Sequence, residues 1–343
     1  MRNFIILAAC MLIFAACNKE GLIPPSNDED MVEVSFNFAG DYVSIDEEPL
    51  TRALAPNAKT LYALQVYSTD TTNKGHRLEE SRTIPYAYGL FDDISNIRLA
   101  LPKDRKFIVK ALIIEEREDT IYHNNGCYDR PFSDLNENDY FDLLHDDITL
   151  SITNQFIVTG GDSRYDAGIA TSSSSGCGMK KVDRYCGYQR FNSSGIRNIS
   201  IKMERYAFAF TYDVVPPFDG TIRVKFYDNI LYEVKAGDGQ KTKQVIYGAP
   251  FSYISEMDPS FIKWDEDYPL EKKEQSTDIN LLIEWERESE NLESHTEEIT
   301  VNIKRKTNYN IYINMNNHEN KSDFGFDLTN ESEFTEGQSI SID

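Results

Sequence analysis

The chain has 343 residues and carries 57 acidic against 35 basic side chains, which gives a net charge of −22 at pH 7. This balance argues against nucleic acid or an anionic lipid surface as a partner, because both require a basic footprint. The 20 tyrosines and 19 phenylalanines are far too many for a disordered chain. Without an N-terminal targeting segment, the length still allows two domains with cores of their own.

Residues 1–16 have the layout of a secretory signal peptide, with one basic residue ahead of about thirteen apolar positions. A membrane-spanning helix needs about twenty apolar residues, and the polar Asn18 ends this run earlier. The stretch Phe14-Ala15-Ala16-Cys17 resembles a bacterial lipobox, in which small residues precede a cysteine that is acylated after cleavage. The alternative is an ordinary signal peptide with an incidental cysteine. We therefore predict a lipid on Cys17 that holds the mature chain outside a membrane.

Residues 17–30 are polar and acidic and are predicted to be a tether. Strict alternation over 31–40 (MVEVSFNFAG) then predicts a half-buried strand, with these residues on its apolar side: Val32, Val34, Phe36 and Phe38. Two more strands are predicted over 60–68 and 105–116. The second of these is apolar on both faces, as a central strand would be.

Further strands are predicted through the rest of the chain. They cover 119–123, 147–158, 221–229, 243–248 and 279–288, and a last short alternation covers 339–342. The segment 133–147 has room for a short helix, and 171–178 (TSSSSGCG) has the composition of a flexible loop.

Two longer stretches carry more detail. Over 196–214 the apolar positions change from odd-numbered to even-numbered, which indicates a β-bulge or bend near Glu204-Arg205. Over 297–315 two alternations flank Lys306–Asn308, and this pattern predicts a hairpin with its turn there.

These patterns predict an all-β protein of two tandem β-sandwiches, because strands recur along the whole chain and no amphipathic helix of useful length interrupts them. The N-terminal sandwich is expected over 31–195 and the C-terminal sandwich over 196–343. Their boundary is expected near Ser193–Arg197.

Five cysteines are present. Cys10 leaves with the signal peptide, and Cys17 carries the lipid. Cys177 and Cys186 are close enough in sequence to form a disulfide in an oxidising compartment, or both stay thiols. Cys127 is then left buried or free. No histidine lies near these cysteines, so we predict no metal site.

No constellation of catalytic residues is found. The five histidines are scattered singly, and with 57 acidic residues pairs of carboxylates are unavoidable. We therefore predict no enzyme activity and no cofactor. Trp264 and Tyr268 could stack on sugars if they are exposed, although packing in a core or at its rim is favoured for both.

Two tripeptides resemble the short O-glycosylation signal of exported proteins of Bacteroidota. They are Asp70-Thr71-Thr72 and Asp119-Thr120-Ile121. The pattern is only three residues long, so the alternative for Thr71 and Thr120 is a chance match.

Together these features resemble the Bacteroidales fimbrillin-like lipoproteins, which include pilin, tip and anchor subunits. The resemblance rests on the lipobox, the first strand, the "TR-A" processing region and four later strands. In this sequence the lipobox is 14–17, the first strand is 31–38, and the processing region is Pro49-Leu50-Thr51-Arg52-Ala53. The four later strands are 60–70, 107–116, 199–214 and 306–315. In 199–214, Met203, Arg205 and Phe208 stand at the places of "L-x-R-x-x-A", and in 306–315, Lys306, Asn308 and Ile311 stand at those of "R-N-x-x-Y-x-I". The cysteine-rich start associated with anchor subunits is missing.

The resemblance implies two transthyretin-like sandwiches that assemble into surface fimbriae. In polymerising members a protease cuts after the arginine and removes the first strand with its lipid, and the open groove accepts a strand from the next subunit. Here Arg52 would be the cut site, Val32–Phe38 the removable strand, and Phe324–Asp343 the donor. The alternative is that Arg52 is an ordinary loop arginine.

The expected partners are other fimbrial subunits, the outer membrane through Cys17, and a ligand on a host or bacterial surface. Nucleic acid is not expected. The alternative function is a surface glycan-binding lipoprotein of a polysaccharide-uptake system. A flat platform of two or three exposed aromatic side chains would favour this alternative, whereas a removable strand favours the fimbrial function.

Overall fold

The computed structural model of the protein describes residues 30–42, 59–69, 83–121, 127–129, 149–160, 179–215, 219–238, 241–248, 276–287, 294–314 and 325–331. Within these ranges the chain forms strands and turns and no helix. The strands are β1 (Met31–Gly40), β2 (Thr60–Thr69), β3 (Thr83–Phe91), β4 (Arg98–Pro102), β5 (Lys106–Glu116), β6 (Cys127–Asp129), β7 (Thr149–Ser151), β8 (Ile157–Val158), β9 (Val182–Asn192), β10 (Asn198–Arg205), β11 (Phe208–Val215), β12 (Thr221–Phe226), β13 (Asn229–Lys235), β14 (Lys241–Tyr247), β15 (Ser276–Glu286), β16 (His295–Lys304), β17 (Asn308–Asn314) and β18 (Gly325–Glu331).

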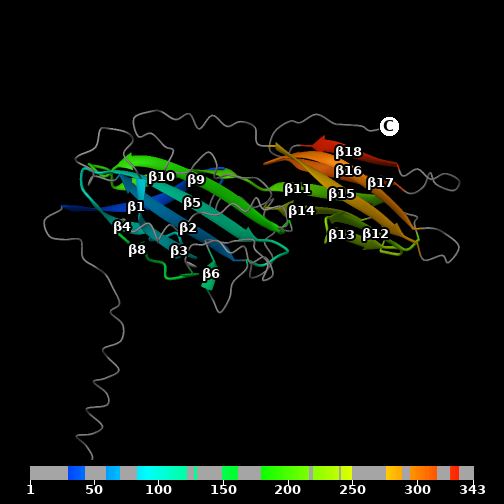
Figure 1. The fold of residues 1–343 in the computed structure, drawn as a ribbon, viewed down its shortest axis with the longest axis horizontal. Helices are drawn as coiled ribbons and strands as arrows, with labels where there is room; N and C mark the ends of the chain where they lie inside the picture. The colour runs from blue at the N-terminus through cyan, green and yellow to red at the C-terminus, as the bar shows by residue number, and fades with distance from the viewer. Residues whose placement is uncertain are drawn as a thin grey trace, which may run out of the picture.

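The described strands form four sheets. An eight-stranded sheet has the order β4-β1-β10-β9-β5-β2-β3-β8, and two four-stranded sheets have the orders β14-β11-β17-β18 and β13-β12-β15-β16. Strands β6 and β7 pair separately. Figure 1 shows the eight-stranded sheet in one half of an elongated molecule and the two four-stranded sheets in the other. The predicted all-β fold with sandwich-like packing is confirmed.

The eight-stranded sheet folds over so that its two ends pack against each other. Phe38 of β1 stacks on Tyr62 of β2 with 5.6 Å between ring centroids, although β10, β9 and β5 lie between these strands in the sheet. Side chains from both ends share one buried core cluster, including Val34, Phe36 and Ile199 from one end and Leu64, Val66 and Val109 from the other. The two ends therefore act as the two layers of a sandwich.

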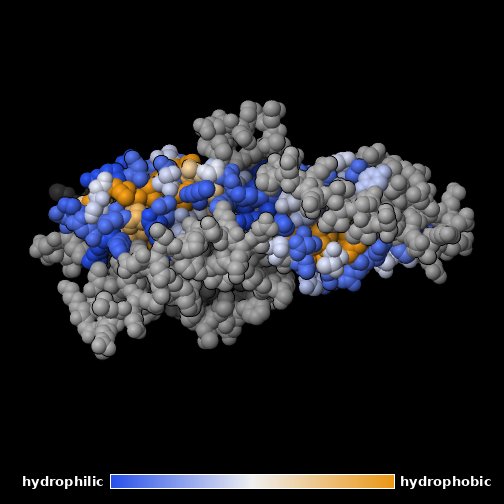
Figure 2. Space-filling view, turned by 90° about the horizontal axis from the view of Figure 1, so that it is seen from above, coloured by the Kyte–Doolittle hydropathy of each residue, from blue (hydrophilic) through white to orange (hydrophobic). Residues whose placement is uncertain are grey.

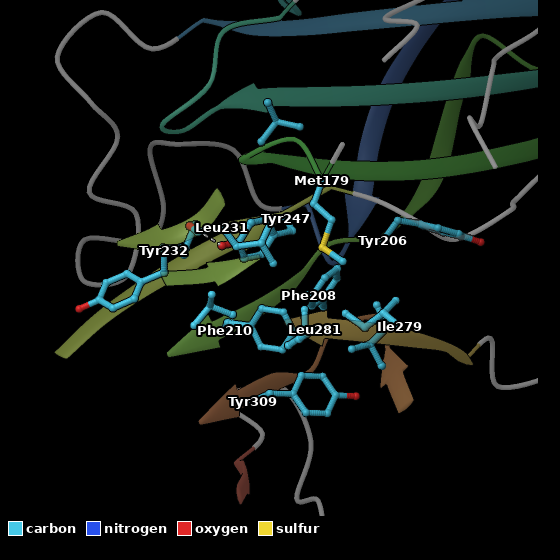
Figure 3. Close-up of a cluster of buried hydrophobic side chains, with 14 of the residues drawn as sticks. Met179, Tyr206, Phe208, Phe210, Leu231, Tyr232, Tyr247, Ile279, Leu281 and Tyr309 are labelled. Carbon is cyan, nitrogen blue, oxygen red and sulfur yellow. Dashed lines mark hydrogen bonds between the residues drawn. The ribbon is translucent and has the colours of Figure 1, made fainter. Parts of the chain in front are cut away.

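The second half buries its apolar side chains between the two four-stranded sheets. Phe208 and Phe210 of β11 lie in one cluster with Leu281 of β15 and Tyr309 of β17 (Figure 3). On β11 and β17 the clustered side chains stand two residues apart, as expected when one face of a strand is buried: Phe208, Phe210 and Tyr212 on β11, and Tyr309, Ile311 and Ile313 on β17. The Met179 side chain lies between the strands of the first half and Phe208, so this core continues into the junction between the halves (Figure 3).

The chain changes sheets directly after Arg205. β10 ends there in the eight-stranded sheet, and β11 starts at Phe208 in a four-stranded sheet. Tyr206 between them donates its N–H to the carbonyl of Arg184 at 2.8 Å. The bend predicted near Glu204-Arg205 is therefore confirmed in its position, but it is a change of sheet. The domain division at 195/196 stays a prediction; β10, which follows it, is hydrogen-bonded in the first sheet.

The hairpin predicted over 297–315 is wrong. β16 pairs with β15, whereas β17 pairs with β11 and β18, so the turn at 305–306 joins two different sheets. Alternation determines which face of a strand is buried, but it does not determine the partner strand. The turn is held instead by the Lys306 N–H, which donates to the Ala207 carbonyl at 2.7 Å.

Two other predicted strands differ from the structure. Residues 119–121 form no strand, since the Ile121 N–H bonds to the Glu116 carboxylate at 3.0 Å and that of Lys181 bonds to Asp119 at 2.8 Å. The stretch 147–158 is interrupted between β7 and β8 at Asn154, which has a φ of 54°. The predicted helix within 133–147, the loop over 171–178, the alternation over 339–342 and most of the tether lie outside the described residues.

Candidate functional site

The first strand lies inside the eight-stranded sheet, between β4 and β10. It runs antiparallel to β4, with Val34 opposite Leu99, and parallel to β10, with Phe36 opposite Ile199. The Phe36 N–H donates to the carbonyl of Ile97 at 2.9 Å. β1 is therefore hydrogen-bonded on both sides by segments far from it in sequence. We call the space between β4 and β10 that β1 fills the strand slot.

The side chains of β1 alternate between the core and the surface. Val32, Val34 and Phe36 are 6, 0 and 3% exposed, and the residues between them face outward or are half-buried. The Phe36 ring packs on Phe156 and Phe191, with ring centroids 5.6 and 6.2 Å apart. Each fully buried side chain of this size contributes roughly 1.5–3 kcal/mol. The strand slot is thus an apolar groove that is closed by β1.

The strand ends at Gly40, which has a φ of 88°. A Cβ atom there would lie 2.5 Å from the Met203 carbonyl oxygen, so the position requires glycine or a shift of the backbone. The next residue, Asp41, donates its N–H to the same carbonyl at 2.9 Å. Its carboxylate accepts the Arg205 N–H at 3.0 Å and pairs with Lys306.

Tyr42 follows and closes this end of the core. Its hydroxyl lies 2.7 Å from that of Tyr62, and its ring meets the edge of Tyr185 at a centroid distance of 5.3 Å. Tyr42 is the last described residue before Lys59, so the segment that contains Arg52 begins at this contact. The two residues that follow β1 therefore contact the first half through Tyr42 and the second half through Asp41.

A network of buried charges lies beside Tyr42. Asp183 of β9 accepts two hydrogen bonds from the Arg205 guanidinium, at 2.8 and 2.7 Å, and one from Arg117 at 3.0 Å. Arg117 also contacts Glu115 at 3.0 Å. Asp183 and Glu115 are both fully buried. Two carboxylates and two guanidinium groups balance each other, as buried charges require.

The arginines determine the charge state of Asp183. Burial alone would raise the pKa of this carboxyl, but the charges and hydrogen bonds of Arg205 and Arg117 outweigh burial and leave the pKa below its ordinary value. Burial likewise disfavours the charged form of Arg205, and Asp183 reverses this effect, so the pKa of Arg205 is raised. Both groups are ionised at neutral pH and act as a structural pair between β9 and β10.

Most of the predicted site residues lie outside the described residues. These are Cys17, Arg52, Thr71 and Cys177. Thr120 is exposed and follows β5, so it is accessible for the predicted glycosylation, which stays a prediction. Val32–Phe38 forms most of β1, and the predicted donor segment 324–343 includes β18, which pairs with β17 at the edge of its sheet.

Cys186 lies on β9 and is fully buried. It is a free thiol among the described residues, and burial raises its pKa to about 12. Because Cys177 lies outside the described residues, the disulfide between the two stays a prediction. Cys127 lies on β6.

The contacts of Asp41 and the buried charges were not predicted from the sequence. One signal was present for Arg205, because it continues the inward phase of Ile199, Ile201 and Met203 and therefore needed a buried carboxylate. Nothing in the sequence identified Asp183 as this partner. The pairing of Asp41 with Lys306 joins residues that are distant in the chain, and no local pattern reports it.

Two negative findings concern the described part of the chain. No helix there is long and apolar enough to cross a membrane. No group of three or more histidine, cysteine, aspartate or glutamate side chains is placed there to hold a metal ion.

Several solved structures are similar to this chain. A candidate cell adhesion protein from Bacteroides ovatus is 10% identical with a TM-score of 0.33, over 92% of this chain and 100% of that one. A candidate polysaccharide-binding protein from Bacteroides thetaiotaomicron is 9% identical with a TM-score of 0.35, over 92% and 99%. The fimbrial anchor protein Mfa2 from Porphyromonas gingivalis is 10% identical with a TM-score of 0.31, over 92% and 100%. No protein-family model and no curated protein matches the chain. Likenesses this weak carry no functional argument, so the function proposed below rests on the residues of this chain.

Proposed function

We propose that the protein is a cell-surface fimbrillin-like lipoprotein, a structural and adhesive subunit of fimbriae. A lipid on Cys17 would deliver it to the outer membrane, and a protease would cut after Arg52. The cut would release β1 with the lipid, and the strand slot would then accept a strand from the next subunit. The observation that supports this most directly is the place of β1, an interior strand at the start of the described chain.

The strand slot has the properties that strand exchange needs. Beyond β1, the described strands of the sheet are linked through β10, β9, β5, β2, β3 and β8, so their hydrogen bonds would survive the loss of β1. Among the described strands, β4 pairs with β1 alone and would be left with an open edge. The loss would also uncover Leu99 and Ile199, which are 4 and 3% exposed in the intact chain. An apolar groove between two unpaired edges is unstable in water and favours an incoming strand.

The proposal is tested by treating the purified mature chain with an arginine-specific protease, followed by mass spectrometry and size-exclusion chromatography. We expect a fragment that begins at Ala53, loss of the peptide that carries β1, and a ladder of oligomers. The matched control is Arg52→Gln, which should stay intact and monomeric under the same treatment. Release of β1 with a persistent monomer would contradict strand exchange.

The lipid anchor is tested separately. Cys17→Ala should move the protein from the membrane fraction to the soluble fraction, because the acyl chains provide the attachment. A Cys10→Ala variant is the control, since Cys10 lies in the predicted signal peptide and should leave fractionation unchanged. If the Cys17→Ala variant stays with membranes, the lipobox assignment is wrong.

The glycan-binding alternative has less support. It requires a platform of several exposed aromatic side chains, and among the described residues, β6 and β18 apart, Tyr227 at 68% exposure is the single large aromatic side chain that is exposed. Trp264 and Tyr268 lie outside the described residues. Figure 2 shows apolar surface on one face of the molecule in separate patches, with hydrophilic surface beside each and between them.

A further inference from the structure

The Asp41 carboxylate lies where the two halves of the molecule meet. It accepts the backbone N–H of Arg205, the last residue of β10, at 3.0 Å. It also pairs with the ammonium group of Lys306, in the turn between β16 and β17. The Lys306 and Asp41 side chains are 28 and 38% exposed, so the pair is partly shielded from solvent. A residue attached to β1 therefore makes a charged contact with the second half.

Both donors are held in place by groups other than Asp41. The backbone of Lys306 is fixed by its N–H bond to Ala207 at 2.7 Å. Its neighbour Arg305 bonds to the Glu204 carboxylate at 3.2 Å and lies over the Tyr206 ring at 5.1 Å. The Arg205 guanidinium is bound to buried Asp183, which fixes the end of β10. The two donors would keep their places after β1 had left.

We propose that the Lys306 ammonium and the Arg205 N–H form a carboxylate-recognition site at the end of the strand slot. Asp41 occupies this site in the intact chain. After β1 is released, an acidic side chain of the incoming strand from a second copy of this chain occupies it. This inference rests on the proposed function. It adds the contact by which the strand slot selects the incoming strand and sets the register in which that strand binds.

The C-terminal part of the chain carries the matching pattern. In β1, three inward apolar residues alternate and an acidic residue follows the last of them at the third position: Val34, Phe36, Phe38 and Asp41. The same spacing recurs over 324–331, in the same chain direction: Phe324, Phe326, Leu328 and Glu331. β18 pairs with β17 on one side and forms the edge of its sheet, so it can leave without disrupting other strand pairs.

One position of this alignment differs in size. Asn330 would fall at the place of Gly40, where a Cβ atom would come within 2.5 Å of the Met203 carbonyl oxygen. The backbone must shift there to admit an asparagine. Asparagine is one of the few residues besides glycine that adopt a positive φ at modest cost, so the register can be kept.

The site itself is tested in the intact full-length chain by a double-mutant cycle with Asp41→Asn and Lys306→Met. Each single substitution should lower the equilibrium constant for folding about fivefold. The double variant should show the same fivefold decrease as a single variant and no further decrease. The exposed pair of Glu33 and Arg98 is the matched control, because Glu33→Gln should change the constant less than twofold. Independent, additive effects of Asp41→Asn and Lys306→Met would overturn the site.

The occupant is tested by transplanting the sequence of 324–331 into positions 34–41 of the full-length chain. We expect this chimera to fold. Replacing the transplanted copy of Glu331, which stands at position 41, by glutamine should make the chimera about fivefold less stable. This difference should disappear when Lys306→Met is added. A chimera that does not fold, or that is insensitive to Glu331→Gln, would overturn the assignment of the occupant. Neither experiment needs cleavage, so failure to cut after Arg52 would contradict the proposed function without affecting this result.

Discussion

The two halves of the molecule contain the same arrangement of four strands. One equivalent place in it is taken by a strand from near the N-terminus in the first half and by a strand from near the C-terminus in the second. In the first half the order is β4-β1-β10-β9, and in the second it is β18-β17-β11-β14. Both orders are joined by an antiparallel, a parallel and an antiparallel pairing. β1 and β17 thus hold equivalent places, each between one parallel and one antiparallel neighbour.

The difference lies in how these two strands are connected. β17 continues directly from β16 through the turn at 305–306, so two cuts would be needed to remove it. β1 is the first described strand, so one cut between Tyr42 and Lys59 would sever it from every other described strand. The first half also links its two layers through the pairing of β9 with β5, whereas no such pairing among the described strands joins the four-stranded sheets of the second half. The two strands therefore have equivalent packing, but one cut would separate β1 from the other described strands, whereas β17 would need two.

The largest effect is expected from equivalent core truncations in β1 and β17. Phe36→Ala and Ile311→Ala both remove buried side chains, 3 and 0% exposed, and each should cost about 2–5 kcal/mol of stability. Phe36→Ala should also speed hydrogen exchange locally along β1 and β10 if, as the proposed function requires, β1 detaches without the rest of the sheet. Ile311→Ala should act only through global unfolding. Equal exchange patterns in the two variants would contradict the conditional attachment of β1.

A somewhat smaller effect is expected from the polar groups that each half buries. Asp183→Asn removes one of the two carboxylates that balance Arg205 and Arg117, leaves Arg205 without its carboxylate partner there, and should cost about 3 kcal/mol in chemical denaturation. In the second half, Tyr247→Phe removes the hydroxyl bonds to Tyr212 at 3.0 Å and to the Leu231 carbonyl at 3.2 Å, and should cost about 1 kcal/mol. A larger cost for Tyr247→Phe would reverse this comparison.

The sequence predicted strands best where the burial pattern was regular. The alternation of apolar and polar residues was sufficient to predict β1, β12 and β15, and the continuous apolar run was sufficient to predict β5. β3 was missed because Pro85 and Gly89 interrupt its pattern. Its pairing with β2 accommodates Pro85 through a shift of register between Val66 and Tyr67. β9 was missed because buried Asp183 and Arg184 make it look polar. Their burial depends on partners that only the folded sheet supplies.

Pairing could not be predicted from the sequence at all. Whether β16 pairs with β15 or with β17 depends on which sheet edge is open after the rest of the chain has folded, and both strands carry the same alternation. The candidate site was predicted in part, since the alternation over 31–40 predicted the strand that forms β1, and its removal stays a prediction. Its anchor Asp41 was not, because an aspartate after a glycine is an ordinary turn residue until Lys306 is placed beside it.

The pH dependence of stability should also separate the halves. The pKa of Asp183 is lower in the folded chain than the unfolded value of about 3.9, so its contribution is present above about pH 4 and is lost as the pH falls further. Burial raises the pKa of Tyr212 and Tyr247 in the folded chain, so their contribution is present below about pH 10 and is lost above it. Asp183→Asn should flatten the acid limb alone, and Tyr247→Phe should weaken the alkaline limb alone. Denaturation curves at pH 3, 7 and 11 provide the measurement.

The smallest expected effect concerns Cys186, whose side chain lies in the cluster that joins β9 to the core of the second half. Iodoacetamide at pH 8 should leave this thiol unmodified in the folded chain, because burial shields it and raises its pKa to about 12. After unfolding without reductant, mass spectrometry should show full modification, since the thiol is then exposed and its pKa returns to its ordinary range. Modification that also requires a reductant would show a disulfide on Cys186 instead, and peptide mapping of the unreduced chain would then test Cys177 as its partner. In that case a covalent bond, and not packing alone, would secure the strand through which the two halves meet.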